Sequence, residues 1–249
     1  MNAERLECRL FECIDNTTLN ATDNDASVEA FCRRTLEMEL SGHHVAGVCI
    51  YPRFVATARR VLQGSGVRVV SVAGAFPHGQ LPISLRVQEV EYVVDAGADE
   101  VDVVLNRGAL LAGEYNQVCD EVALMKQACG ACLLKVILET GELATSALIA
   151  KAAQLTIDGG ADFIKTSTGK IGVGATLEAA EVMLNVIKNN VKFNKKTIGF
   201  KAAGGIRTPE EALEYAKMAQ KILGDDYVKN QTFRIGASSL TERLFSFLT

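Results

Sequence analysis

ADFIKTSTGK, residues 161–170, joins an apolar run typical of a strand to a loop of Ser, Thr, Gly and Lys. Side chains alternate between the two faces of a strand, so Phe163 and Lys165 share one face while Ile164 and Thr166 share the other. Lys165 is therefore expected in an apolar layer, where desolvation favours the neutral, nucleophilic amine. The alternative is a structural lysine that extends its amine to water.

An apolar segment followed by a helical segment recurs along the whole chain. The predicted strands are residues 13–19, 45–51, 67–73, 100–105, 132–139, 162–167, 197–202 and 233–237. The predicted helices are residues 27–40, 53–62, 81–96, 108–128, 143–159, 176–189, 208–223 and 240–248. Eight such units, with strands that are apolar on both faces, predict a closed parallel (β/α)8 barrel, the TIM barrel, in preference to an open doubly wound sheet.

The composition predicts one domain that acts on a small ligand. The 249 residues are 48% hydrophobic and contain no linker, so we expect a single domain over residues 1–249. The net charge is −4 and the 26 basic residues are dispersed, which argues against nucleic acid or a membrane as a partner. The N-terminal MNAERLECRLFEC has acidic residues where a signal peptide is apolar, so we expect a cytoplasmic protein.

The cysteines and histidines indicate neither a disulfide framework nor a metal site. Seven cysteines are an odd number in a long chain, which fits reduced thiols. Cys129 and Cys132 form a lone CxxC motif, a weak zinc signal without a second pair. His43 and His44 precede the second predicted strand, where solvent exposure is the simpler account, and His78 is the third histidine. We expect no metal and no cofactor.

Four neighbouring predicted strands each carry one charged residue inside an apolar run: Asp102, Lys135, Lys165 and Lys201. A purely structural salt-bridge network requires roughly balanced charge, because an unpaired buried ion costs several kcal/mol. Three lysines against one aspartate are not balanced. Lys201 beside Lys165 is expected to lower the pKa of the better desolvated amine, which predicts a Schiff-base lysine with Asp102 as the acid/base group.

Three glycine-containing loops follow the sixth, seventh and eighth predicted strands. They read Thr168-Gly169-Lys170, Gly204-Gly205-Ile206-Arg207 and Gly236-Ala237-Ser238-Ser239. Backbone N–H groups and a helix N-terminus at this end of a barrel commonly bind phosphate. One such loop is ordinarily only a turn, whereas three converging loops predict a phosphate site. Arg207 has a second interpretation, in which it faces solvent or the helix cap.

Eight segments of the sequence closely resemble deoxyribose-phosphate aldolases. They are DNTTL (15–19), VCIYPRF (48–54), FPHG (76–79), GADEVDVV (97–104), LLKVILETGEL (133–143), GADFIKTSTGK (160–170), GFKAAGGIRT (199–208) and FRIGASSL (233–240). The resemblance implies a metal-free class I aldolase on a (β/α)8 barrel that interconverts 2-deoxy-D-ribose 5-phosphate with acetaldehyde and D-glyceraldehyde 3-phosphate. It also implies a homo-oligomer, a dimer or a tetramer.

The resemblance assigns roles to individual residues. It makes Lys165 the imine-forming lysine, Lys201 the lysine that perturbs it and Asp102 the proton-relay carboxylate. Around the sugar it implies Asp15, Thr17, Leu19, Cys49, Phe76 and Lys135. Around the phosphate it implies Lys170, Gly204, Gly205, Gly236, Ser238 and Ser239. Cys49 has a plain alternative as a core thiol.

The sequence departs from the family at its C-terminal end. Some members carry a mobile tail whose terminal tyrosine assists the enamine proton transfer, whereas this sequence ends LFSFLT. Three alternatives follow. Water or another group transfers the enamine proton, the enzyme turns over slowly, or the protein is a regulator or partner subunit that only binds phosphate. A metal-dependent epimerase or class II aldolase would require a cluster of metal ligands.

Overall fold

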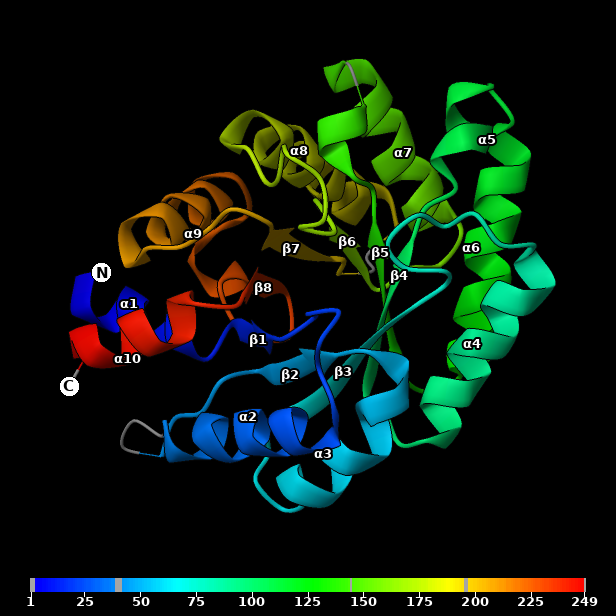
Figure 1. Ribbon diagram of the computed structural model, residues 1–249. Helices are drawn as coiled ribbons and strands as arrows, with labels where there is room; N and C mark the ends of the chain where they lie inside the picture. Colours follow the sequence, from blue (N-terminus) through cyan, green and yellow to red (C-terminus); the bar gives the residue numbers. More distant parts are fainter. Residues whose placement is uncertain (1–2, 39–41, 144, 195–196, 249) are drawn as a thin grey trace.

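The computed structural model describes residues 3–38, 42–143, 145–194 and 197–248, and its strands form one closed parallel barrel (Figure 1). Within these ranges the strands are β1 (Ile14–Thr17), β2 (Gly47–Ile50), β3 (Arg68–Ala73), β4 (Glu100–Val104), β5 (Leu133–Ile137), β6 (Phe163–Lys165), β7 (Gly199–Ala203) and β8 (Phe233–Ala237). Each strand pairs with the next, and β8 returns to β1 through Ile14 opposite Ile235. The predicted barrel is confirmed, and the open sheet is wrong.

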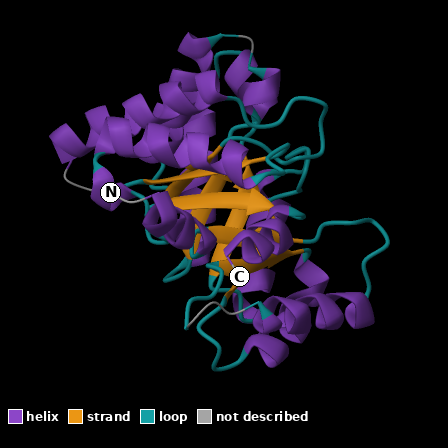
Figure 2. Ribbon diagram, turned by 90° about the vertical axis from the view of Figure 1, so that its left-hand side faces the viewer, coloured by secondary structure: helices purple, strands orange, loops and turns teal. Residues whose placement is uncertain are grey.

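Helices enclose the strands on the outside (Figure 2). They are α1 (Ala3–Phe11), α2 (Asp25–Glu37), α3 (Val55–Leu62), α4 (Ile83–Asp95), α5 (Arg107–Leu111), α6 (Tyr115–Cys129), α7 (Ser146–Asp158), α8 (Leu177–Asn194), α9 (Pro209–Leu223) and α10 (Leu240–Leu248). The predicted helix at residues 27–40 ends earlier, and its last two residues lie outside the described ranges, as does residue 144 of the predicted helix at 143–159. No helix in the described ranges is long and apolar enough to cross a membrane.

Two helical features differ from the sequence prediction. The predicted helix at residues 108–128 is divided into α5 and α6, because the chain turns at Gly113, whose φ is 80°. The helix α1 was not predicted; it buries Leu10 and Phe11, and the Phe11 ring lies 6.3 Å from the ring of Phe245 on α10. Figure 1 shows α1 beside α10, so the two ends of the chain close the helical layer together.

The start of α9 follows the sequence prediction closely. Thr208 is the N-cap and accepts a hydrogen bond from the backbone of Glu211, whose side chain accepts from the backbone of Thr208. Pro209 occupies the first helical position, where its missing N–H costs nothing. This capping box fixes where α9 begins, shortly after the Gly204–Gly205 loop that follows β7.

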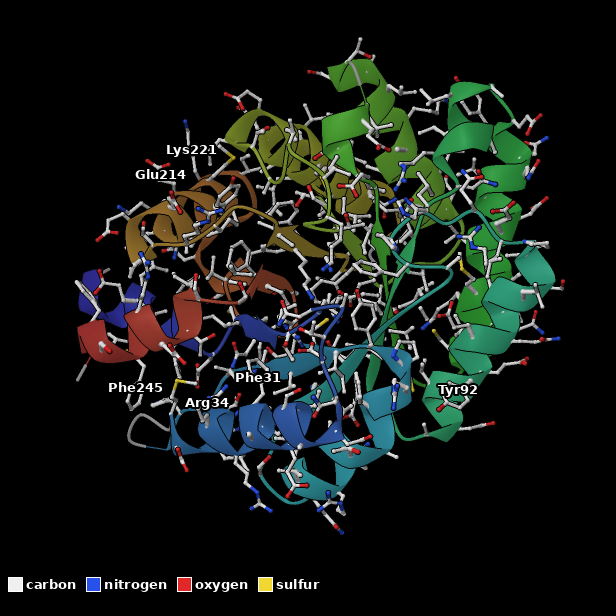
Figure 3. The ribbon with its side chains drawn as sticks, in the orientation of Figure 1. Phe31, Arg34, Tyr92, Glu214, Lys221 and Phe245 are labelled. Atoms are coloured by element: carbon white, nitrogen blue, oxygen red, sulfur yellow. The ribbon has the colours of Figure 1, made fainter. Side chains whose placement is uncertain are left out.

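Charged side chains occupy both the outside and the centre of the molecule. Figure 3 shows Glu214 and Lys221 of α9 and Tyr92 of α4 pointing away from the barrel, as is usual for a helical layer that faces solvent. On β4, Val101 and Val103 face outward to the helical layer, so the alternation of side chains turns Glu100 and Asp102 into the barrel. The barrel centre is therefore charged where an aliphatic layer is usual.

Space inside the barrel is limited by Phe163 on β6. Gly199 lies opposite it in the register, and a Cβ atom on Gly199 would lie 2.3 Å from the Phe163 ring. The guanidinium carbon of Arg234 lies 5.7 Å from the centroid of the same ring. The Phe163 ring therefore packs both against the backbone of β7 at Gly199 and against a charged group of the barrel centre.

Candidate active site

A cavity of about 320 Å³ opens at the carboxyl ends of the strands, the end at which barrels of this kind place their sites. Its lining comes from the exits of β1, β6, β7 and β8 and comprises Thr17, Leu19, Asn20, Lys165, Thr168, Gly169, Lys170, Ala203, Gly204, Gly205, Ile206, Arg207, Gly236, Ala237, Ser238 and Ser239. Among the charged residues of the barrel centre that the structure describes, only Lys165 lines this cavity.

Lys165 and Lys201 share one carboxylate oxygen. The two residues are register partners on β6 and β7, and each Nζ lies 2.8 Å from Oδ2 of Asp102 on β4. Asp102 uses its other oxygen, Oδ1, to accept from Nζ of Lys135 at 2.8 Å. The structure thus brings all four charged residues predicted from the strand pattern into one buried cluster.

The cluster contains three charged residues that the sequence analysis did not count in it. Asp15 accepts hydrogen bonds from Lys201 and from Arg234. Glu100 contacts Lys135 and Arg234, and both of these contacts are 2.6 Å long. The interior charge network is therefore Asp15, Glu100, Asp102, Lys135, Lys165, Lys201 and Arg234. The prediction that three lysines face a single aspartate is wrong. Asp15 on β1 and Glu100 at the start of β4 supply two further carboxylates, and Arg234 on β8 supplies a further cation.

The two lysines on Asp102 Oδ2 have opposite pKa shifts. Burial lowers the pKa of Lys165, and the charge of Lys201 lowers it further, which together outweigh the single carboxylate beside it. Burial acts in the same direction on Lys201, but Asp102 and Asp15 outweigh it and raise the pKa of that amine above its usual value. Lys135 also has a raised pKa, for the same reason. Lys165 is thus the amine of this cluster that is easiest to deprotonate.

Backbone geometry shapes the floor of the predicted phosphate site. Gly204 has φ 88°, and a Cβ atom there would lie 3.1 Å from Cα of Gly174 and 3.3 Å from Cα of Gly169. Only glycine permits the loops after β6 and β7 to approach so closely. Ser238 and Ser239 are exposed at the start of α10, so hydroxyls and helical N–H groups face the same cavity.

The family profile of DeoC/LacD aldolases matches residues 10–243. The chain belongs to this family. It is therefore an aldolase, a carbon–carbon lyase.

Solved structures agree with this assignment. A candidate deoxyribose-phosphate aldolase from Coccidioides immitis is 28% identical, with a TM-score of 0.84 over 97% of this chain and 87% of that one. A structure described as QR15, an aldolase, is 31% identical, with a TM-score of 0.78 over 96% of both chains. A deoxyribose phosphate aldolase from Aeropyrum pernix, described as having a unique tetrameric structure, is 26% identical, with a TM-score of 0.75 over 99% of this chain and 98% of that one.

The residues predicted around the sugar occupy two different environments in the aldolase. Thr17 and Leu19 line the cavity, and Leu19 packs with Cys49 and Phe76 in a small apolar cluster on the inner side of β1 to β3. Asp15 and Lys135 are fully buried in the interior charge network and do not line the cavity. The cavity therefore adjoins the small apolar cluster at Leu19 and the interior charge network at Lys165.

The predicted phosphate residues lie together at the other side of the aldolase cavity. Gly204, Gly205, Gly236, Ser238, Ser239 and Lys170 all line it. Nζ of Lys170 donates to the backbone carbonyl of Leu19, which links the loop after β6 to the loop after β1. Arg207 is exposed and also lines the cavity, so its side chain lies at the solvent edge of the site.

Glu139 is a functional candidate that the sequence analysis missed. It follows β5 with φ 55° and is fully buried, and its carboxylate accepts from the backbone N–H of Thr168 at 3.2 Å and from the Thr168 hydroxyl. Nη1 of Arg107 lies 3.9 Å from it. A left-handed conformation in a non-glycine residue is sparsely populated and marks a position held by its surroundings. Glu139 therefore anchors the start of the loop that carries Lys170.

None of the histidines or of the two CxxC cysteines lines this cavity. Nδ1 of His43 is 2.6 Å from Oε1 of Glu12, at an exposed position. Cys129 and Cys132 are free thiols near the end of α6 and the start of β5. In the described ranges no group of three His, Cys, Asp or Glu side chains is arranged to hold a metal ion.

Proposed function

We propose that this aldolase is a class I, Schiff-base enzyme that cleaves 2-deoxy-D-ribose 5-phosphate reversibly to D-glyceraldehyde 3-phosphate and acetaldehyde. The observation that carries the proposal is the position of Lys165, an amine with a lowered pKa on the wall of a cavity that glycine and serine loops also line. Two of the similar solved structures are described as deoxyribose-phosphate aldolases, one of them as a candidate, which supports the same substrate.

The first chemical step uses the neutral amine. Nζ of Lys165 attacks C1 of the open-chain aldehyde, and loss of water from the carbinolamine gives a protonated imine. A base then removes the proton of the C3 hydroxyl, and the C2–C3 bond breaks with its electron pair moving toward the imine nitrogen. Glyceraldehyde 3-phosphate leaves, and the enamine on Lys165 takes up a proton at C2 before hydrolysis releases acetaldehyde.

Asp102 is the base that this scheme requires. Its carboxylate stays ionised because the three neighbouring lysines outweigh the effect of burial and hold its pKa well below the usual range. Asp102 is fully buried, so the proton passes to it through water or through Lys201, which shares its Oδ2 atom. The same shared oxygen keeps the base close to the imine nitrogen throughout the cycle.

The phosphate loops orient the other end of the substrate. Backbone N–H groups beside Gly204, Gly205 and Gly236, and the start of α10, suit a phosphate dianion. Binding energy at this remote group fixes the position of C1 relative to Lys165, which raises the rate of the chemical step. In this proposal the enzyme acts in the cytoplasm in the breakdown of deoxyribose units, as a homo-oligomer.

Ser238→Asp tests both the substrate and the phosphate site. A carboxylate at this exposed serine repels the phosphate, so KM for 2-deoxyribose 5-phosphate is expected to rise roughly 10- to 100-fold, about 1.4 to 2.8 kcal/mol, with a smaller change in kcat. Cleavage is measured by coupling the formation of acetaldehyde, the product common to both substrates, to its reduction by an NADH-dependent alcohol dehydrogenase. Unphosphorylated 2-deoxyribose is expected to show no such rise.

The uncharged, similarly shaped Ser238→Asn variant is the matched control, and its KM is expected to stay within a few-fold of the wild type. An unchanged KM in Ser238→Asp would contradict the phosphate assignment. Absence of glyceraldehyde 3-phosphate from the wild-type reaction would contradict the proposed substrate itself.

A further inference from the structure

The cations of the interior charge network differ in how many carboxylates they contact. Lys135 has three within 4 Å, namely Asp15, Glu100 and Asp102. Lys201 and Arg234 have two each. Lys165 has one, Asp102, which it shares with Lys201. Lys165 is therefore the least compensated cation of the network.

The network also carries an excess of positive charge. With every group ionised, it holds four cations and three carboxylates, which leaves one surplus positive charge in a region that meets solvent only at Lys165, which lines the cavity. An uncompensated charge in such a region is costly, and loss of a proton is the usual way to remove it. The arginine cannot lose a proton at accessible pH, so one of the three lysines must.

We propose that Glu100 and Arg234 are positioning residues. Their charges keep the cations of the barrel interior one in excess of its carboxylates, and Lys165 is the amine that loses a proton to remove this excess. They act through the network and not on the substrate, since both are buried and neither lines the cavity. This inference rests on the proposed function, in which a neutral Lys165 is the nucleophile.

The contacts of Arg234 explain how its charge reaches Lys165. One nitrogen, Nη1, donates to Oδ1 of Asp15 and lies 3.0 Å from Oε2 of Glu100, while Nη2 donates to Oε1 of Glu100 at 2.6 Å. Asp15 then contacts Lys201 through Oδ2, and Lys201 contacts the oxygen of Asp102 that Lys165 also uses. A change of charge at Arg234 thus reaches Lys165 across four contacts inside the barrel. A change at Glu100 reaches it across three, through Lys135 and Asp102.

Few other charged or titratable groups lie near Lys165 or near the far end of the network in the described residues. The groups that face Lys165 are Asp102 on β4, Lys201 on β7 and Cys49 on β2. Burial raises the pKa of the Cys49 thiol, so it is neutral at neutral pH and does not alter the count. Nη1 of Arg68 lies 3.5 Å from Glu100, but its side chain is 45% exposed and is screened by solvent.

The two positioning residues carry opposite charges, so their removal has opposite expected effects. Arg234→Met leaves three cations against three carboxylates, which favours the protonated form of Lys165. The acidic limb of the kcat/KM profile for 2-deoxyribose 5-phosphate is then expected to move up by about one pH unit. Glu100→Gln increases the surplus, and the limb is expected to move down by about as much.

The double variant Glu100→Gln/Arg234→Met is the decisive control. It restores the surplus of one positive charge, so its acidic limb is expected to return to within about 0.3 pH unit of the wild type, even if its stability and maximal rate are lower. The phosphate group of the substrate titrates identically in all four proteins, so differences between the profiles report the enzyme. A purely structural role would lower the rates of both single variants without moving the limb in opposite directions.

Circular dichroism establishes that each variant is folded before its profile is compared. Where Arg234→Met alone does not fold, Glu100→Gln and the double variant differ by the same arginine charge and carry the test. Shifts in the same direction, no shift, or a double variant that does not return overturns the inference. If wild-type protein forms no imine at Lys165, the proposed function fails; if it forms the imine and the limbs do not separate, only the present inference fails.

Discussion

The Lys165→Leu variant is expected to lose aldol cleavage by a factor on the order of 10⁶, the scale of loss when an enzyme's nucleophile is removed. Leucine has no amine, so neither the carbinolamine nor the imine forms. Lys201 is not expected to substitute, because Asp102 and Asp15 raise its pKa and keep it protonated. Turnover is measured with the coupled assay at a high enzyme concentration.

Folding of Lys165→Leu is expected to remain intact. The change removes a buried amine that has a single carboxylate partner, and Asp102 keeps Lys135 and Lys201. Replacement of a buried polar group by an apolar side chain of similar size costs little, and can stabilise a protein, when the group's partner keeps its other contacts. Lys188 is an exposed lysine on α8, so the Lys188→Leu variant is the matched control, and it should retain wild-type turnover. Turnover above about 1% of wild type in Lys165→Leu would show that another amine forms the imine.

The Asp102→Asn variant is expected to lose about 10²- to 10⁴-fold in kcat, the usual contribution of a general acid or base. Asparagine keeps the shape of the side chain but cannot accept the proton of the C3 hydroxyl. Lys165 meanwhile loses its one carboxylate partner, so its neutral form is favoured further. Imine formation is therefore expected to continue while carbon–carbon cleavage becomes much slower.

These two effects on Asp102→Asn can be separated by measurement. Reduction with borohydride in the presence of acetaldehyde should label Lys165 in the variant as fully as in the wild type, although turnover is lost. Asp158→Asn, which neutralises an exposed carboxylate on α7, should change neither quantity. Loss of labelling together with turnover would mean that Asp102 acts in imine formation and not as the base for cleavage.

The barrel could be predicted because its strands are apolar on both faces and recur regularly with helices between them. The period of the strand also placed Lys165 on the inner face of the barrel, since its alternation with Ile164 holds in β6. The expected apolar layer around Lys165 is wrong, because charged side chains from neighbouring strands fill the barrel centre. The helix α1 escaped prediction because, from residue 6 onward where its side chains are described, only Leu6, Leu10 and Phe11 are buried, and that face is completed by α9 and α10 from the other end of the chain. A local pattern carries no information about such a partner.

The balance of charge inside the barrel could be predicted only in part. Arg234 interrupts the apolar run of FRIGA as Lys201 interrupts GFKAA, so the same signal was present in the sequence. Which carboxylates meet which amines depends on the stagger of the strands around a closed barrel, and the pairing of β1 with β8 sets it for Asp15 and Arg234. The role of Glu139 likewise depends on its left-handed backbone, which no spacing in the sequence indicates.

The central claim is that Lys165 forms an imine with the aldehyde substrate, and borohydride trapping tests it most directly. The wild-type protein is incubated with acetaldehyde or 2-deoxyribose 5-phosphate, reduced, digested and mapped by mass spectrometry. We predict one reduced adduct on the peptide that contains Lys165, absent when substrate or reductant is omitted and absent from Lys165→Leu. A folded wild-type protein that gives no adduct, or gives it on another lysine, would contradict the account.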